Sequence, residues 1–164
     1  MYEFGDIVKL FLKACDTFLE NNRDLIKLNV NERDYCHHLA CEITFLLRQS
    51  NFKKYFCDVE YNRNHGQIKT IKTNDGNMRN INVDLIIHSR CNDKENDNML
   101  ALEMKKISNT NQDIEKDRER LRYLTNMNRE YRYKYGILFL IDCNNVKANI
   151  EIYENGRQKN NMII

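Results

Sequence analysis

The sequence predicts an α/β protein of one domain, in which a central mixed β-sheet lies between two layers of helices. Two patterns of helix-spaced apolar residues occupy roughly the first fifty positions, and the spacing then changes to the alternation of strands. A charged helical stretch later separates two more apolar strands. Helices that precede and interrupt the strands in this order are expected to cover both faces of the sheet. A chain of 164 residues is long enough to bury one such core.

The first two elements are predicted to be helices. Apolar residues at helical spacing predict an N-terminal helix within residues 1–22, ahead of a domain core that spans about residues 30–154. A second helix is predicted to begin near Asn31, a favourable N-cap residue, and to end near Gln49. Glu32 and Asp34 fall in its first turn, where the helix dipole favours acidic side chains.

The remaining elements are predominantly strands. Alternating or continuous apolar residues predict strands at 55–61, 80–88, 99–106, 135–142 and 148–154, with a charged helix at 112–128. The segment 66–73 either pairs with the first strand or forms an excursion, because strong turn residues follow it. Residues 155–164 are expected to be a loose tail.

Composition excludes several classes of protein. Hydrophobic residues make up 41% and charged residues 30%, which is typical of a globular chain rather than a disordered one. The sequence shows neither an apolar run of membrane-spanning length nor an export signal, so we expect no membrane partner and a cytoplasmic location. The six cysteines are then expected to be reduced thiols. A formal net charge of only +2 means that any nucleic-acid footprint must be local.

Two neighbouring predicted strands carry an unusual set of charged residues. Glu103 and Lys105 are two positions apart, so they share one face of their strand. Asp84 interrupts the apolar run of the preceding strand, where an ionised carboxylate is costly unless it is paired or binds a cation. A hairpin would bring Asp84 beside Glu103. Two carboxylates beside a lysine suit Mg²⁺ or Mn²⁺ and phosphodiester hydrolysis, although an ordinary ion pair on a sheet surface gives the same spacing.

At this point the chain resembles the PD-(D/E)XK, or restriction endonuclease-like, nuclease superfamily, and in particular its small uncharacterised bacterial and phage members. The resemblance spans about residues 32–141. It is carried by 83–88 and 100–106, and by Glu32-Arg33, Leu39-Ala40, the stretch 60–63, Asp117, Arg120-Leu121, and Tyr133 with Tyr135-Gly136. Val83 stands where the motif has a proline, which shapes the strand entry and does no chemistry.

The resemblance implies a restriction endonuclease-like fold and a set of residue roles. Asp84 and Glu103 would be metal ligands, Lys105 the catalytic lysine, and Glu32 an additional acidic member of the site. The implied activity is that of a Mg²⁺-dependent endonuclease with DNA as its expected substrate, in which a metal-activated water attacks the phosphodiester.

Three further residues are candidates for contacting nucleic acid. Arg63 lies after the first strand, where an ion pair within the strand is an equal alternative. His88 has even spacing from Asp84, which predicts the same face, although a histidine at a strand end is more often structural. Arg120 is placed near the site by the resemblance. The arginines at 118, 122 and 129 alternate with acidic residues, which favours an ordinary solvated helix face.

Two other functions compete with the nuclease. The first is a catalytically inactive nuclease-fold module for binding or regulation. Catalysis requires Asp84, Glu103 and Lys105 to converge in an accessible cleft, and the catalytic assignment fails if Glu103 instead faces a packed helix. The second is a zinc module at Cys36, His37 and Cys41, which the orientation of Cys36 on the helix disfavours. No separate recognition domain is evident, so specificity is either low or supplied by a protein partner or a homodimer.

Overall fold

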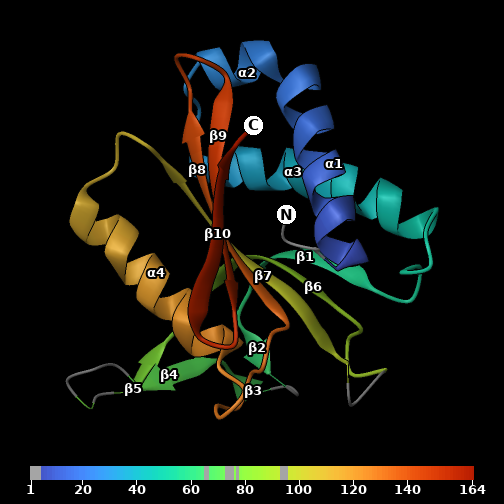
Figure 1. Cartoon of the computed structure of the whole chain (residues 1–164), viewed down its shortest axis with the longest axis vertical. Helices are drawn as coiled ribbons and strands as arrows, with labels where there is room; N and C mark the ends of the chain where they lie inside the picture. Colours follow the sequence, from blue (N-terminus) through green and yellow to red (C-terminus); the bar gives the residue numbers. More distant parts are fainter. Residues whose placement is uncertain (1–4, 65–66, 73–75, 77, 93–95) are drawn as a thin grey trace.

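The computed structural model describes residues 5–64, 67–72, 76, 78–92 and 96–164. Its fold is mixed α/β, with a six-stranded sheet and helices on both faces (Figure 1). The helices are α1 (Asp6–Asn21), α2 (Arg23–Lys27), α3 (Glu32–Arg48) and α4 (Asn111–Thr125). The main sheet contains β1 (Phe56–Tyr61), β6 (Val83–His88), β7 (Asn98–Lys106), β8 (Tyr135–Asp142), β9 (Lys147–Glu154) and β10 (Arg157–Ile163). Two short hairpins are formed by β2 (Arg63–Asn64) with β3 (Gln67–Ile68), and by β4 (Thr70–Lys72) with β5 (Met78–Asn80).

The strand order in the main sheet is β1-β6-β7-β8-β9-β10. β7 and β8 are parallel, whereas every other neighbouring pair is antiparallel. A parallel pair needs a crossover connection, and α4 supplies it. The sheet is therefore mixed, as the sequence predicts.

Two apolar clusters hold the helices to the sheet. α1 and α3 cover one face, where Phe18 and Leu39 pack with sheet residues such as Leu102. α4 covers the other face through a second cluster that includes Leu121 and Leu138. In Figure 1 these helices lie on opposite sides of the strands. The alternation of apolar residues along β7 and β8 thus serves two separate cores.

The start of α3 is fixed by its cap. The side chain of Asn31 accepts a hydrogen bond from the backbone N–H of Asp34 at 3.1 Å, which satisfies one of the free donors of the first turn. The predicted N-cap is confirmed. Glu32 consequently becomes the first helical residue, and its side chain is held at the end of α3 that meets the sheet.

The predicted strands at 55–61, 99–106, 135–142 and 148–154 are confirmed to within one residue at each end. β6 begins three residues later than the predicted start at Asn80, because Met78–Asn80 forms β5 instead. The segment before it is an excursion, since β1 pairs with β6 and not with residues 67–72. Neither α2 nor these short hairpins has a periodic apolar signal long enough to predict them.

The expectation of a loose tail at 155–164 was wrong. Residues 157–163 form the edge strand β10, which pairs with β9, and the backbones of Ile164 and Ala148 exchange hydrogen bonds of 2.9 and 3.0 Å. Most side chains of β10 are exposed and polar, so the apolar alternation that reveals a strand is missing. Backbone pairing defines most of this edge, and Met162 and Ile164 pack against the main core.

None of the helices in the described part of the chain has both the length and the apolar character needed to cross a membrane.

Candidate active site

The candidate site lies where β6 separates from β7. The last matched pair of the two strands is Leu85 opposite Leu102, and continuing this register sets Asp84 opposite Glu103. Beyond that pair the backbone N–H of Met104 donates to Oδ2 of Asp84 at 2.8 Å instead of to a carbonyl of β6. The predicted hairpin therefore does bring Asp84 beside Glu103. The Asp84 carboxylate is oriented by the free edge of β7.

Glu32 reaches the same free edge from α3. Its Oε1 accepts a hydrogen bond of 3.1 Å from the backbone N–H of Lys106, one alternation beyond Met104. Its Oε2 lies 3.6 Å from Nζ of Lys105. The carboxylates of Asp84 and Glu32 thus accept hydrogen bonds from two backbone N–H groups of β7. In each carboxylate the second oxygen makes no such backbone contact.

Lys105 lies among these acids. Its Nζ is 3.2 Å from Oδ2 of Asp117 on α4 and donates to the carbonyl of Met104 at 3.2 Å. Burial by itself would lower the pKa of this ammonium, but the charges of Asp117, Asp84 and Glu32 raise the pKa above its ordinary value. Lys105 is therefore held as a cation.

Glu103 is the most deeply buried member of the site, with no exposed surface. Nη1 of Arg120 lies 2.9 Å from its Oε2, but neither carboxylate oxygen meets hydrogen-bond geometry with any described group. Burial, followed by repulsion from Asp84, raises the pKa of Glu103 well above its ordinary value. Burial likewise raises the pKa of Asp84. An additional positive charge near these two carboxylates would be strongly favourable.

α4 contributes the other two charged groups. Arg120 contacts both Glu103 and, at 3.4 Å, Oδ1 of Asp117. Asp117 is only 3% exposed, and its Oδ2 also lacks a hydrogen-bond partner among the described groups. The sequence pattern singled out Asp117 but not its contact with Lys105, because which residues of a helix meet a strand depends on how the helix is docked.

The cluster carries an excess of negative charge. Its acidic members are Glu32, Asp84, Glu103 and Asp117, and its basic members are Lys105 and Arg120. Four acids against two bases would carry a formal charge of −2 if all were ionised, and the raised pKa values of Glu103 and Asp84 show that the fold opposes this full ionisation. A divalent cation would offset the repulsion and favour the ionised carboxylates.

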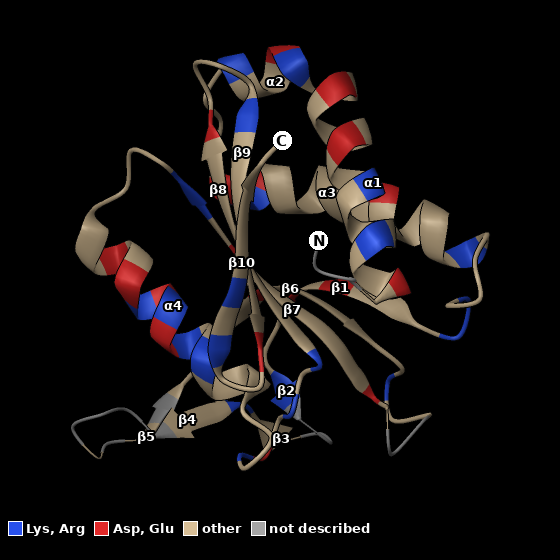
Figure 2. Ribbon diagram, in the orientation of Figure 1, with Lys and Arg blue, Asp and Glu red and all other residues tan. Residues whose placement is uncertain are grey.

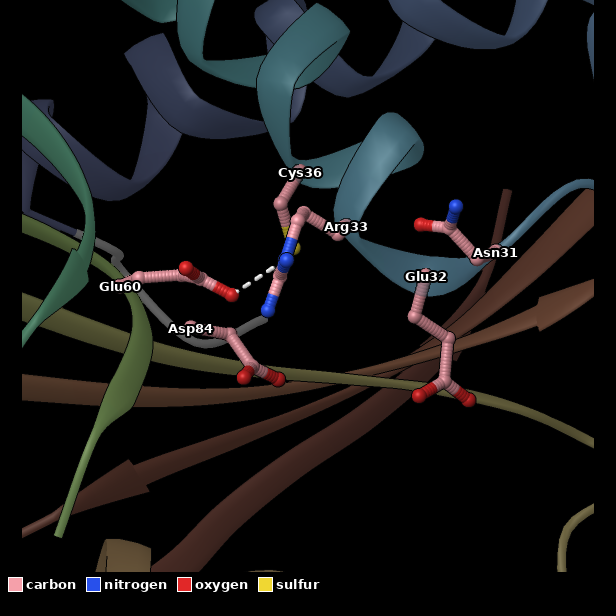
Figure 3. Close-up of a pocket in the computed structure, with 6 residues that line it drawn as sticks. All are labelled: Asn31, Glu32, Arg33, Cys36, Glu60 and Asp84. Carbon is pink, nitrogen blue, oxygen red and sulfur yellow. Dashed lines mark ion pairs between the residues drawn. The ribbon is translucent and has the colours of Figure 1, made fainter.

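A cleft of about 350 Å³ opens onto one side of the cluster. It is lined by Asn31, Glu32, Arg33, Cys36, Glu60 and Asp84, which Figure 3 shows. Asp84 and Glu32 are therefore reached from solvent. Glu103 is not: in this conformation it faces Arg120 and Asp117 on the packed helix α4.

The structure places the three predicted nucleic-acid contacts in different surroundings. Arg120 belongs to the charged cluster, whereas Arg63 is an exposed residue in the short strand β2. His88 is 3% exposed and lies 2.8 Å from Oδ2 of Asp58, with its ring 4.6 Å from that of Tyr61. His88 therefore contacts other core groups and is not brought to the cluster.

Unlike Arg120, the other two arginines of α4, Arg118 and Arg122, lie on the outer, partly solvated face of the helix. Arg118 pairs with Glu151 and Glu115, and Arg122 pairs with Glu115. Figure 2 shows acidic and basic positions alternating along this helix. The buried Glu151, held by Arg118 and by the hydroxyl of Tyr153, is a polar anchor of α4 that the sequence pattern did not reveal.

The alternative zinc ligands do not converge. The Cys36 thiol contacts Sδ of Met104 at 3.8 Å in the core, whereas His37 and Cys41 line a separate surface groove, so Cys36 is apart from the other two. No disulfide joins any of the six cysteines, all of which lie in the described part of the chain. Within the described residues, no three His, Cys, Asp or Glu side chains are already arranged as a metal centre.

No protein-family model, no curated protein and no solved structure matches this chain.

Proposed function

We propose that the protein is a divalent-metal-dependent nuclease of the restriction endonuclease-like kind, with DNA as its expected substrate. The observation that carries the proposal is the meeting of Asp84, Glu103 and Lys105 where β6 leaves β7, with Glu32 arriving from α3. These are the residues that also carry the resemblance of the sequence to the PD-(D/E)XK superfamily.

The residues suit Mg²⁺ or Mn²⁺. Both ions prefer oxygen ligands, and Mg²⁺ commonly uses one or two carboxylates and keeps several waters, so a complete protein cage is not needed. Arg120 alone does not offset the burial of Glu103 and its repulsion from Asp84, since the pKa values of both carboxyls stay raised, so a further cation is favoured at this place. Asp84 and Glu103 would hold the ion, with Glu32 as the third carboxylate. A bound ion would activate a water molecule and offset the charge that develops on phosphorus.

The other side chains have separate roles in this proposal. Lys105, held as an ammonium, orients the attacking water and stabilises negative charge on the phosphate oxygens. Asp117 positions Lys105 through their 3.2 Å contact. Arg120 balances the charge of Glu103 in the free protein, so Glu103 must exchange this arginine for the cation.

A catalytically inactive binding module is the competing function, and one observation favours it. Glu103 has no exposed surface and faces α4, as such a module predicts. Such a protein would bind nucleic acid or a protein without cutting phosphodiester bonds. The two functions therefore differ in cleavage.

The deciding experiment incubates the purified chain with supercoiled, linear and single-stranded DNA and with RNA, in Mg²⁺, Mn²⁺ or EDTA. We expect cleavage that requires the metal. We also expect Asp84→Asn, Glu103→Gln and Lys105→Met each to lower the rate by roughly 100-fold or more, by analogy with the loss of one electrostatic group from an active site. Supercoiled DNA distinguishes single nicks, expected of a monomer, from double-strand breaks, expected of a dimer.

Two exposed substitutions provide matched controls: Asp16→Asn on α1 and Lys116→Met on α4. Both should leave the rate unchanged. Equal cleavage by the wild type and by Lys105→Met would assign the activity to another site or to a contaminant. Absence of cleavage from every substrate would favour the binding module.

A further inference from the structure

An ion pair spans the mouth of the cleft above Asp84. Nε of Arg33, in the first turn of α3, lies 2.5 Å from Oε1 of Glu60 on β1. Both residues line the cleft, and Figure 3 shows their side chains meeting over it. This pair has no part in the charged cluster around Lys105.

Glu60 lies at the end of a row of acidic residues. In the β1–β6 register Val59 is opposite Leu85 and Tyr61 is opposite Val83, which sets Glu60 opposite Asp84. Asp84 in turn is opposite Glu103 on β7. Like charges at directly opposite positions of neighbouring strands destabilise a sheet. Arg33 therefore offsets the negative charge of Glu60, the member of this row nearest to solvent.

The backbone of Glu60 is in an unusual conformation. Its φ angle is 51°, in the left-handed region that glutamate seldom adopts. Strain of this kind persists where surrounding structure enforces it and is concentrated at functional sites. In this protein the strained residue is Glu60, the same residue whose side chain contacts Arg33.

The Arg33–Glu60 pair is easily exchanged. The Arg33 side chain is 74% exposed and that of Glu60 is 40% exposed, and ion pairs this open contribute little net stability because water screens them. A phosphate group offers the guanidinium the same two-oxygen geometry as a carboxylate. Arg33 also lies in the first turn of α3, where the helix dipole favours an anion.

We propose that Arg33 binds a backbone phosphate of the nucleic acid, and that Glu60 occupies Arg33 as a competing anion in the free protein. The inference rests on the proposed function, because a strand entering this cleft brings its phosphates to Arg33 beside Asp84. Substrate binding then exchanges one ion pair for another. Glu60 lowers the affinity for nucleic acid because a phosphate must displace its carboxylate from Arg33. A nucleic-acid strand can therefore occupy the cleft only if its other contacts offset the loss of the Arg33–Glu60 pair.

The test is a double-mutant cycle on DNA binding, measured by fluorescence anisotropy with labelled 20-nucleotide single-stranded and duplex DNA in EDTA. EDTA removes cleavage from the measurement. We expect Glu60→Gln to tighten Kd roughly three- to tenfold and Arg33→Gln to weaken it roughly tenfold, the effect of about one phosphate contact. Arg33→Gln should also reduce the slope of log K against log salt by about one. The double variant should bind like Arg33→Gln, because Glu60 has then lost the group through which it acts.

Glu42→Gln, at a half-buried position, and Arg48→Gln, at an exposed one, lie on the same helix; they are the matched controls and should bind like the wild type. The proposal is overturned if Glu60→Gln binds like the wild type, if no variant binds DNA, or if Glu60→Gln tightens binding equally in the Arg33→Gln background. That last result would mean general charge repulsion. Cleavage is scored separately, so an active nuclease that fails this cycle refutes only the role of Arg33 and Glu60. A protein that passes it without cutting refutes only the nuclease.

Discussion

Arg120 on α4 lies 2.9 Å from the carboxylate of Glu103, which is completely buried in β7. This contact joins the helix to the sheet at the centre of the candidate site. A buried acid beside a cation from a different element is expensive to separate, because removal of one partner leaves the other charge unpaired. The same contact controls whether Glu103 is available to a metal ion.

Removing that arginine tests its structural contribution. We expect Arg120→Met to lower the free energy of unfolding by roughly 2–4 kcal/mol at pH 7.5, near the lower end of the cost of breaking a buried pair because Arg120 is partly exposed. The folded-state pKa of Glu103 is already raised, and it should rise further in the variant. Protonation of Glu103 then stabilises the folded variant as the pH falls toward the ordinary value of 4.5. Urea unfolding at pH 7.5 and 5.5 should show the deficit of Arg120→Met shrinking.

Arg122→Met is the matched control for this change, because Arg122 pairs with Glu115 on the exposed side of the same helix. Its effect should stay below about 1 kcal/mol at both pH values. A deficit of Arg120→Met that does not depend on pH would argue against an unpaired charge on Glu103.

The sequence was sufficient to predict which strands and which helix carry the acidic residues and the lysine of the site. It was not sufficient to predict how α4 packs against them. Strand alternation placed Glu103 and Lys105 on one face, and the helix cap placed Glu32 at the start of α3. How α4 docks depends on tertiary packing, so the contacts of Asp117 and Arg120 had no local signal. The pairing of Arg33 with Glu60 depends on a left-handed residue in β1, and no sequence pattern identified that conformation.

The wrong expectation for the tail has a physical origin. Residues 155–164 were interpreted from side-chain patterns, whereas backbone pairing decided their place. β10 forms an edge strand without apolar alternation. The even spacing of His88 from Asp84 likewise did not reveal its neighbours: His88 contacts Asp58 and Tyr61 from β1 instead of the charged cluster.

Metal ions should stabilise the folded protein if the excess of acidic groups forms a cation site. With a dissociation constant near 1 mM, 10 mM Mg²⁺ would contribute about 1.4 kcal/mol. For a chain of this size that energy raises Tm by roughly 3–6 °C. Thermal unfolding followed by circular dichroism measures the shift, with matched ionic strength in the metal-free sample. Asp84→Asn, which keeps an oxygen for the Met104 N–H, should lose most of the shift, while Asp16→Asn should keep it. Equal shifts in both variants would place the metal elsewhere.

His88 should matter for stability and not for nucleic-acid binding. Burial lowers the pKa of His88 despite the opposing effect of Asp58, and Arg90 holds the same carboxylate at 2.6 and 3.0 Å. His88→Gln disturbs this buried network, so we expect a loss of about 1–3 kcal/mol in urea unfolding. Its Kd for DNA in EDTA should remain within about twofold of the wild type. Weaker binding with unchanged stability would instead make His88 a nucleic-acid contact.

Lys69 is a buried lysine that fixes the excursion between β1 and β6. It is 2% exposed, and its Nζ donates to the hydroxyl of Tyr133 at 2.5 Å and lies 5.0 Å from the ring of Tyr61. Its backbone joins the two ends of the excursion, through hydrogen bonds to Asn62 and from Ile81 of 2.7 and 2.9 Å. Burial lowers the pKa of this ammonium from 10.5 to about 8, against a smaller opposing effect of Asp97.

This lowered pKa predicts a pH dependence that Lys69→Met should remove. Between pH 8 and 10.5 the unfolded chain keeps the Lys69 proton that the folded protein has lost, so the wild type gains stability relative to the variant as the pH rises. The gain approaches about 1.4 kcal/mol per pH unit within that window. Buried cysteines and tyrosines titrate in both proteins and cancel in the difference. Urea unfolding at pH 7.5, 8.5 and 9.5, under reducing conditions, measures it. Lys116→Met, at an exposed lysine, should show a constant difference. Parallel curves for the wild type and Lys69→Met would mean that Lys69 stays charged in the fold, held by its ring of tyrosines.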